Sequence, residues 1–237
     1  MKQLNVQAIF NSIDGEVNGF NGSGELTTFI RLKGCNLRCV HCDTAYSQDG
    51  TAKTWMTLDQ IVAWPNILDK VTITGGEPLI QENVSELISL LLELGHRVSV
   101  ETNGSRLKAP IRPITCFIAF DSLVTNNLRY IVDYKLPSSG MEQHMNSVVF
   151  PLLSSTDVIK FVISDEVDYN RAIELIQTRK EWKARKVFSP GFSVNQTDIS
   201  WPTKLAEKML QDSDKLQNVQ YSLQIHKILW PNATTER

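Results

Sequence analysis

Short apolar runs rich in β-branched and aromatic residues recur along this chain, and each is typical of a buried strand. Segments with helical periodicity lie between several of these runs, so strands and helices alternate. Such alternation indicates βαβ units, with a parallel sheet and right-handed crossovers. The strands are predicted at residues 28–32, 71–74, 98–102, 129–135, 158–163 and 186–188.

Two helices are predicted with defined ends. In the first, residues 84–94, Leu87, Leu90, Leu91 and Leu94 fall on one helical face, and Gly95 provides a stop. A second helix is predicted at residues 167–178, after Ser164 and Asp165, either of which can provide the N-cap.

The remaining periodic segments are less regular. Trp64 and Pro65 interrupt a helical pattern at residues 58–67, and residues 219–230 fit a strand that runs into a helix. About six strand-helix steps are fewer than the eight of a closed barrel, and 237 residues are slightly short for one. The expected fold is therefore α/β, a partial, open β/α barrel with parallel strands in a single domain, residues 1–237.

Composition and charge narrow the class of protein. With 42% hydrophobic and 21% charged residues, the chain is globular rather than disordered, collagen-like or a coiled coil. A formal charge of -2 gives no general attraction for nucleic acid. The first residues lack the apolar core of a signal peptide, and the apolar stretch at residues 87–92 is far too short to span a membrane. We therefore expect a cytoplasmic protein with no direct nucleic-acid partner and no membrane association.

Three of the four cysteines form a C-x3-C-x2-C motif directly after the first predicted strand. Cys35, Cys39 and Cys42 lie on one loop, where three thiolates can converge on an inorganic centre. Structural zinc takes four protein ligands, and His41 is too close to Cys42 to complete the set easily. Three thiolates on an iron-sulfur cluster leave one iron open to an outside ligand. Zinc and three buried free cysteines remain the alternatives, and Cys116 is expected in the core.

A glycine motif follows the next predicted strand, at residues 74–78. Gly75 and Gly76 have no Cβ, so the backbone can approach a ligand closely and offer its carbonyls to an ammonium. An ordinary turn into a helix would look the same. The cysteine and glycine motifs together resemble the radical S-adenosylmethionine superfamily. This resemblance implies that the three cysteines hold a 4Fe-4S cluster whose fourth iron binds S-adenosylmethionine, and that reduction by an external one-electron donor releases a 5'-deoxyadenosyl radical.

Further segments resemble one family of that superfamily, the 7-carboxy-7-deazaguanine synthases. They are residues 12–16, Arg31, residues 42–44, 101–104, 133–140 and 224–227, which span nearly the whole chain. The resemblance implies a lyase that converts 6-carboxy-5,6,7,8-tetrahydropterin to 7-carboxy-7-deazaguanine by radical ring contraction with loss of ammonia. It also implies a step toward queuosine and other deazapurines, a Mg2+ ion and a homodimer.

The family pattern assigns roles by position. The implied substrate-binding residues are Ile13, Asp14, Gly15, Glu16, Arg31 and Thr74. Those implied for S-adenosylmethionine are His41, Cys42, Asp43, Gly76, Asp133, Tyr134 and Lys135. Thr44 is implied as the Mg2+ ligand, and a hydroxyl oxygen suits such a hard cation.

The substrate chemistry agrees with these assignments. A pterin presents N–H donors that acidic side chains accept, and a substrate carboxylate suits the guanidinium of Arg31. The sequence departs from the family at Asp14, where most members have Gln; Asp lacks the amide donor and adds a charge.

Several features are left without a role or with competing ones. Tyr134 is equally well explained by core packing, and no role follows for Gln224, His226 and Lys227, nor for the two remaining histidines, His96 and His144. Two rival functions share the cysteine spacing: a glycyl-radical activase, which needs a protein substrate, and a zinc-stabilised binding module.

Overall fold

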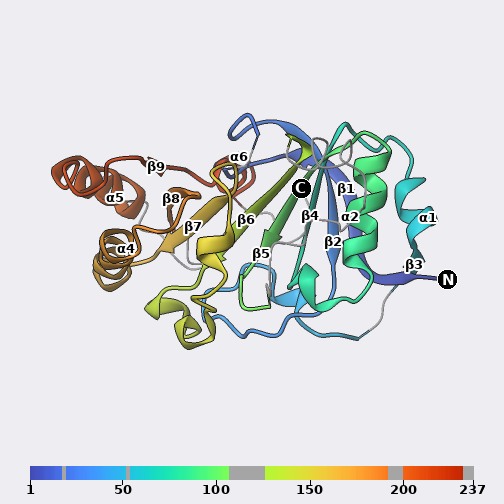
Figure 1. Cartoon of the computed structure of the whole chain (residues 1–237), viewed down its shortest axis with the longest axis horizontal. Coiled ribbons are helices and arrows are strands. Elements are labelled where there is room, and N and C mark those ends of the chain that lie inside the picture. The colour runs from blue at the N-terminus through green and yellow to red at the C-terminus, as the bar shows by residue number, and fades with distance from the viewer. Residues whose placement is uncertain (18–19, 52–53, 107–125, 192–199, 232–237) are drawn as a thin grey trace.

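The computed structural model describes residues 1–17, 20–51, 54–106, 126–191 and 200–231 (Figure 1). The strands are β1 (Gln3–Ile13), β2 (Leu26–Leu32), β3 (Thr54–Thr57), β4 (Lys70–Gly75), β5 (Arg97–Thr102), β6 (Leu128–Tyr134), β7 (Val158–Ile163), β8 (Arg185–Pro190) and β9 (Val219–Tyr221). The α-helices are α1 (Leu58–Val62), α2 (Val84–Glu93), α4 (Glu166–Thr178), α5 (Ser200–Gln211) and α6 (Ile225–Leu229).

All six predicted strands are confirmed, as β2 and β4 to β8, with ends that differ by no more than two residues. The strand and helix predicted at residues 219–230 are confirmed as β9 and α6. The sequence prediction missed β1, whose polar residues Gln7 and Asn11 interrupt its apolar pattern, and the short β3. It also missed α5. Cys116 lies outside the described residues.

The helix predictions hold except at one position. Asp165 accepts a hydrogen bond from the backbone N–H of Asp168 at 2.9 Å, which confirms the N-cap of α4. Gly95 ends α2 with a φ of 88°. The prediction that Leu94 shares the buried face of this helix is wrong: α2 ends at Glu93, and Leu94 is 55% exposed.

The sheet is open. Its order is β3-β1-β2-β4-β5-β6-β7-β8-β9, and among the described residues β3 and β9 are edges that do not pair with each other. Neighbours from β2 through β9 are parallel, whereas β1 runs antiparallel to both β2 and β3. The expected open β/α barrel with mostly parallel strands is therefore confirmed.

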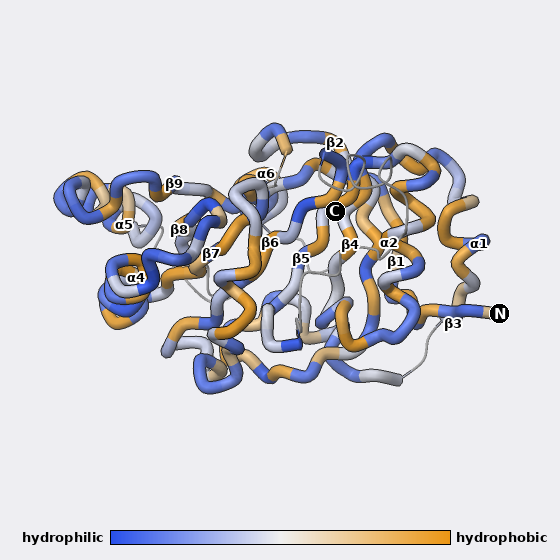
Figure 2. Tube along the Cα trace, viewed as in Figure 1, coloured by the Kyte–Doolittle hydropathy of each residue, from blue (hydrophilic) through white to orange (hydrophobic). Residues whose placement is uncertain are grey.

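The two faces of the sheet differ in polarity. Apolar residues such as Val71, Ile73 and Val100 pack with the inward face of α2 in the main core, and Figure 2 shows hydrophobic positions gathered along these strands. The intervening positions of the same strands carry polar side chains, among them Thr74 and Glu101, which point to the concave side. Alternation along each strand thus separates a dry outer core from a polar inner face.

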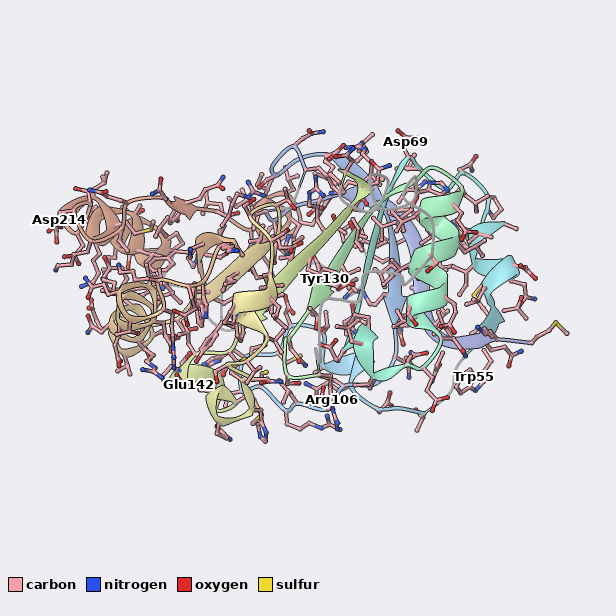
Figure 3. All side chains as sticks on the ribbon, viewed as in Figure 1. Trp55, Asp69, Arg106, Tyr130, Glu142 and Asp214 are labelled. Atoms are coloured by element: carbon pink, nitrogen blue, oxygen red, sulfur yellow. The ribbon has the colours of Figure 1, made fainter. Side chains whose placement is uncertain are left out.

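The two ends of the parallel strands lie on opposite sides of the molecule. Asp69, which precedes β4, and Arg106, which follows β5, mark these two ends (Figure 3). Because β1 is antiparallel to β2, its last residue pairs with the first residue of β2, Ile13 with Leu26. The segment after β1 therefore reaches the inner face from the end opposite to the cysteine loop. Within the described ranges, no helix is long and apolar enough to cross a bilayer.

Candidate functional site

A cavity of about 390 Å³ runs along the polar inner face of the sheet. Every residue to which the family pattern assigns a role lines this cavity. At one end are the cysteine loop and its neighbours: Cys35, Cys39, His41, Cys42, Asp43, Thr44, Gly76, Asp133, Tyr134 and Lys135. The residues assigned to the substrate also line it: Ile13, Asp14, Gly15 and Glu16 lie toward the other end, and Arg31 and Thr74 lie near the carboxyl ends of β2 and β4.

Main-chain hydrogen bonds hold the cysteine loop directly beyond β2. The N–H of Gly34 donates to the carbonyl of Ser47 at 2.8 Å, and that of Cys35 donates to Gln48 at 3.2 Å. All three thiols are free and partly exposed to the cavity. Burial raises the pKa of the thiols of Cys35 and Cys39. Such thiols lose their protons only when a cation or metal stabilises the thiolate.

The glycine motif packs directly against this loop. The N–H of Gly76 donates to Leu32 at 3.1 Å, and the N–H of Glu77 donates to Gly34 at 2.8 Å. A Cβ on Gly76 would lie 2.3 Å from the carbonyl oxygen of Gly34, closer than any side chain can approach. Glycine is therefore required at this position by the cysteine loop itself.

Glu77 links the glycine motif to the end of β5. Its fully buried carboxylate accepts from the Thr102 hydroxyl at 2.8 Å, the Asn103 N–H at 2.7 Å and the Leu79 N–H at 2.9 Å. Asn103 in turn extends its amide to within 3.8 Å of the Cys35 sulfur. Glu77 thus stabilises the walls around the cysteines.

Alternating charges cross the middle of the cavity. The ammonium of Lys160 binds Glu16 and lies 3.8 Å from Asp133, which also binds Lys135 at 2.7 Å. Although burial disfavours the charged ammonium, the carboxylates of Asp133, Glu16 and Glu101 raise the pKa of Lys160. One oxygen of Asp133, Oδ1, is buried and has no hydrogen-bond partner among the described residues. It can accept a hydrogen bond from a bound molecule.

Glu101 faces the same space from β5. Burial, together with the negative charges of Glu16 and Asp14, raises the pKa of Glu101 to about 7. Its carboxyl group can therefore hold or release a proton near neutral pH. No role for Glu101 or Lys160 is predicted from the sequence. Each is a charged residue within a mostly apolar strand, at a position whose side chain faces the cavity. A charge at such a position was the available signal in the sequence.

Arg31 and Thr74 lie side by side near the carboxyl ends of β2 and β4. They are register partners of the two parallel strands. The Arg31 guanidinium also lies 5.8 Å from the centre of the Phe10 ring, which limits the directions it can take. Thr44 places its hydroxyl 3.7 Å from the Cys42 sulfur and has no helix-capping hydrogen bond. A guanidinium, two hydroxyls and the cysteine loop thus share one wall.

Residues near the end of the chain close the cavity. The Gln224 amide donates to Glu16 at 2.8 Å, and the Ile225 N–H donates to the Gly15 carbonyl at 2.7 Å. A Cβ on Gly15 would lie 2.5 Å from His226 Nδ1, so glycine lets α6 approach. Lys227 binds Asp43 at 2.9 Å. Gln224, His226 and Lys227 therefore join the N-terminal segment to the cysteine loop.

Two assigned residues have additional structural partners. Asp14 is fully buried and forms an ion pair with Lys70, the first residue of β4, which the sequence analysis did not consider. Tyr134 lines the cavity, yet its ring packs against Phe150, Phe161 and Trp182. Core packing therefore accounts for the tyrosine ring.

Comparison with known proteins identifies the family. Residues 29–119 match the model of the radical SAM superfamily. Over 229 residues the chain is 39% identical to the 7-carboxy-7-deazaguanine synthase of Clostridium acetobutylicum, a match that covers 94% of this chain and 95% of that protein. It is 34% identical over 245 residues to the enzyme of the same name from Koribacter versatilis, covering 98% and 99%.

Solved structures agree in fold. The crystal structure of QueE from Escherichia coli superposes with a TM-score of 0.67 at 21% identity and covers 94% of this chain and 95% of that one. Streptococcus suis SuiB bound to S-adenosylmethionine gives a TM-score of 0.52 at 16% identity, over 80% of this chain and 45% of that one. The sequence matches span nearly the whole of each protein and therefore establish the family as well as the fold. The chain belongs to the 7-carboxy-7-deazaguanine synthase family of radical SAM enzymes.

Proposed function

We propose that this cavity converts 6-carboxy-5,6,7,8-tetrahydropterin to 7-carboxy-7-deazaguanine by ring contraction with release of ammonia. The observation that carries the proposal is that all residues assigned to cluster, cofactor and substrate line one cavity. The name shared by relatives aligned over almost the whole chain points to the same product. The chain would act as one radical SAM domain, residues 1–237, in deazapurine and queuosine synthesis.

The residues at the cysteine end fit a 4Fe-4S cluster with S-adenosylmethionine beside it. Three thiols open into the cavity, and the buried Oδ1 of Asp133 lacks a partner there among the described residues. The residues that would hold the cofactor are His41, Asp43, Gly76, Asp133, Tyr134 and Lys135. When bound, the cluster and S-adenosylmethionine supply one-electron chemistry that removes a hydrogen atom from substrate.

The charged residues at the other end suit a pterin with a carboxylate. Asp14 and Glu16 can accept hydrogen bonds from the N–H groups of the pyrimidine ring, with Ile13 and Gly15 shaping the turn between them. Arg31 can grip the substrate carboxylate with two parallel hydrogen bonds. Thr74, its neighbour across the strands, completes that wall. The protein's main contribution is to hold these groups in contact, which is worth roughly 7–11 kcal/mol of a reaction barrier.

Mg2+ would bind next to Thr44. The hydroxyl of this residue lies on the wall that carries the cysteines, and it makes no capping hydrogen bond to the short 3-10 helix that follows, Ala45–Ser47. Mg2+ retains waters and takes oxygens from its substrate, so one protein ligand is sufficient when a carboxylate is near. In that position the ion would neutralise the substrate carboxylate and orient it.

Glu101 is the group best suited to proton transfer. Release of ammonia requires that the departing nitrogen gain protons, and the ring must lose others. A carboxyl group with a pKa of about 7 exists in both forms at neutral pH. Glu101 can therefore pass protons between substrate and solvent while Lys160 stabilises its ionised form.

The physiological setting is also part of the proposal. The enzyme would be a cytoplasmic homodimer that takes electrons from an external one-electron donor, with no direct nucleic-acid partner. The small net charge of -2 supports a small-molecule rather than a nucleic-acid substrate.

The test is anaerobic turnover by the reconstituted protein with the carboxytetrahydropterin, S-adenosylmethionine, a reductant and Mg2+. The expected products are 7-carboxy-7-deazaguanine, identified by mass, and 5'-deoxyadenosine or recycled S-adenosylmethionine. Omission of Mg2+ should lower the rate. If the reduced holoprotein leaves the pterin unchanged, the proposed function is wrong. A glycyl-radical activase would instead form 5'-deoxyadenosine only when its protein substrate is added.

A further inference from the structure

Asp14 is an acid on the cavity wall with a counter-ion behind that wall. The residue is 1% exposed, and its Oδ2 binds the ammonium of Lys70, whose side chain is 0% exposed. Asp14 is among the described residues that line the cavity, whereas Lys70 is not. Lys70 therefore acts on the cavity only through Asp14.

The lysine belongs to a row of alternating charges that leads away from the cavity. Glu25 Oε2 lies 4.0 Å from the Lys70 ammonium, and Glu25 Oε1 binds Arg97 at 2.5 Å. Arg97 is partly exposed at the far end of the row. Each charge in this row therefore has an opposite neighbour, as a buried charge requires.

The pair determines what Asp14 can offer to a ligand. Burial raises the pKa of Asp14 above its usual value, and the charge of Lys70 and its hydrogen bond work against that rise. Without the lysine, a carboxyl group this deeply buried would take up a proton and become a donor. The ammonium of Lys70 opposes that uptake and favours the ionised, accepting form. Its second oxygen, Oδ1, receives one long hydrogen bond, from the Glu16 N–H at 3.4 Å, and retains acceptor capacity.

We propose that Asp14 and Lys70 form a substrate-positioning pair, in which Lys70 keeps Asp14 an acceptor for an N–H group on the pyrimidine ring of the pterin. Asp14 touches the substrate, and Lys70 positions it without contact. The proposal rests on the proposed function and identifies a residue that sets its specificity. It also accounts for the departure from Gln at this position, since the charge that Asp adds is balanced by a partner within the same chain.

The pair should favour a ligand whose pyrimidine ring presents N–H donors to Asp14. The 2-amino-4-oxo pyrimidine of the substrate presents neighbouring N–H donors, whereas a 2-oxo analogue replaces the amino group with a carbonyl. A carboxylate that cannot become a donor repels that carbonyl. The unaltered holoenzyme should therefore bind the 2-oxo analogue at least about 100-fold more weakly than the substrate. Comparable binding of the two compounds would overturn the proposal.

Variants test the role of Lys70 directly. Three proteins are compared with wild type under anaerobic conditions: Lys70→Met, Asp14→Asn with Lys70→Met, and Lys2→Met. The last removes the exposed partner of Glu86 and serves as the control for losing a lysine. Each is measured for kcat and KM, and for substrate binding to the unreduced holoenzyme by equilibrium dialysis.

Lys70→Met should raise KM and the dissociation constant about 10-fold or more, with a much smaller change in kcat, because the lost interaction holds bound substrate. Asn is an acceptor that needs no counter-ion, so the double variant should return both constants to within about 5-fold of wild type. A merely structural role would lower the amount of folded protein and leave KM unchanged.

The outcomes separate the two proposals. If wild type converts the carboxytetrahydropterin and Lys70→Met keeps the wild-type KM, the positioning pair is wrong and the proposed function stands. If the double variant binds as weakly as Lys70→Met, the pair is also wrong. If Lys70→Met does not fold, the double variant, which removes both buried charges, and the 2-oxo analogue on wild type decide the question. If wild type does not convert the pterin, the proposed function itself fails.

Discussion

The two ends of the cavity are built in different ways. At the cysteine end, neighbouring loops are joined by main-chain hydrogen bonds, such as that from Glu77 to Gly34. At the substrate end, side chains far apart in sequence meet: Glu16 binds Lys160, 144 residues away, and Gln224, 208 residues away. The first end depends on backbone geometry, and the second on the balance of buried charges.

This difference explains what the sequence could predict. The requirement for glycine at position 76 and for three closely spaced cysteines is local, so it leaves a motif that can be recognised in the sequence. The strands and two helices were equally accessible, because alternation and capping are local as well. The family pattern supplied the remaining assigned residues, all of which line the cavity.

The charge partners could not be predicted in the same way. Lys70 and Lys160 begin or interrupt apolar strands, and the sequence alone gives no indication of which acid each one meets. The pairing of Lys70 with Asp14 requires the antiparallel turn of β1 back along β2. Only the tertiary fold brings Lys70, the first residue of β4, next to Asp14, which directly follows β1.

Removal of one cluster ligand should have the largest effect. Cys39→Ala should abolish turnover and the brown iron-sulfur absorbance, because two thiolates do not retain the cluster. The test is iron content, visible absorption and anaerobic product formation. The substrate end should survive, so substrate binding to the cluster-free protein should change less than 3-fold relative to cluster-free wild type. A Cys39→Ala protein with a full cluster and activity would refute the ligand assignment.

Removal of the central lysine should damage the other end. Lys160→Met leaves the carboxylates of Glu16 and Asp133 buried without their shared cation. The expected loss in free energy of unfolding is about 3–5 kcal/mol, measured by urea denaturation. Lys208→Met, which breaks the exposed pair with Glu166, is the matched control and should cost under about 1 kcal/mol. Equal losses in free energy of unfolding would show that the buried ion pairs of Lys160 contribute no more to stability than an exposed pair does.

Glu101 should give the substrate end a distinctive pH dependence. The pKa of Glu101 is raised from 4.5 to about 7, so the folded protein binds this proton more tightly than the unfolded chain does. Wild type therefore loses stability as pH rises from about 4.5 to about 7, and the loss persists above that range. Glu101→Gln should remove up to about 3 kcal/mol of this pH-dependent change.

The free energy of unfolding is measured for wild type and Glu101→Gln at pH 5 and at pH 8. The change between the two pH values is then compared between the two proteins. Other titrating groups cancel in that comparison. If both proteins lose the same stability between the two pH values, Glu101 does not carry the raised pKa. The kcat profile should lose the corresponding inflection near neutral pH in the variant.

The contact between the two ends should give the smallest effect. Lys227 and Asp43 are 29% and 44% exposed, so Lys227→Met should cost under about 1 kcal/mol of stability. KM for the substrate should rise about 2- to 3-fold at low salt and approach that of wild type at high salt, because salt screens exposed pairs. Lys2→Met again serves as the control. A KM that does not respond to salt in wild type would contradict a role for this ion pair.

The contact of Gly15 with His226 has a consequence for how the enzyme is made. The segment around Gly15 leaves the ribosome early, whereas the residues that cover it are synthesised more than two hundred positions later. During translation the turn at Gly15, which is assigned to the substrate, stays uncovered until α6 emerges. A chain that terminates before Gln224 would lack the residues that cover this turn.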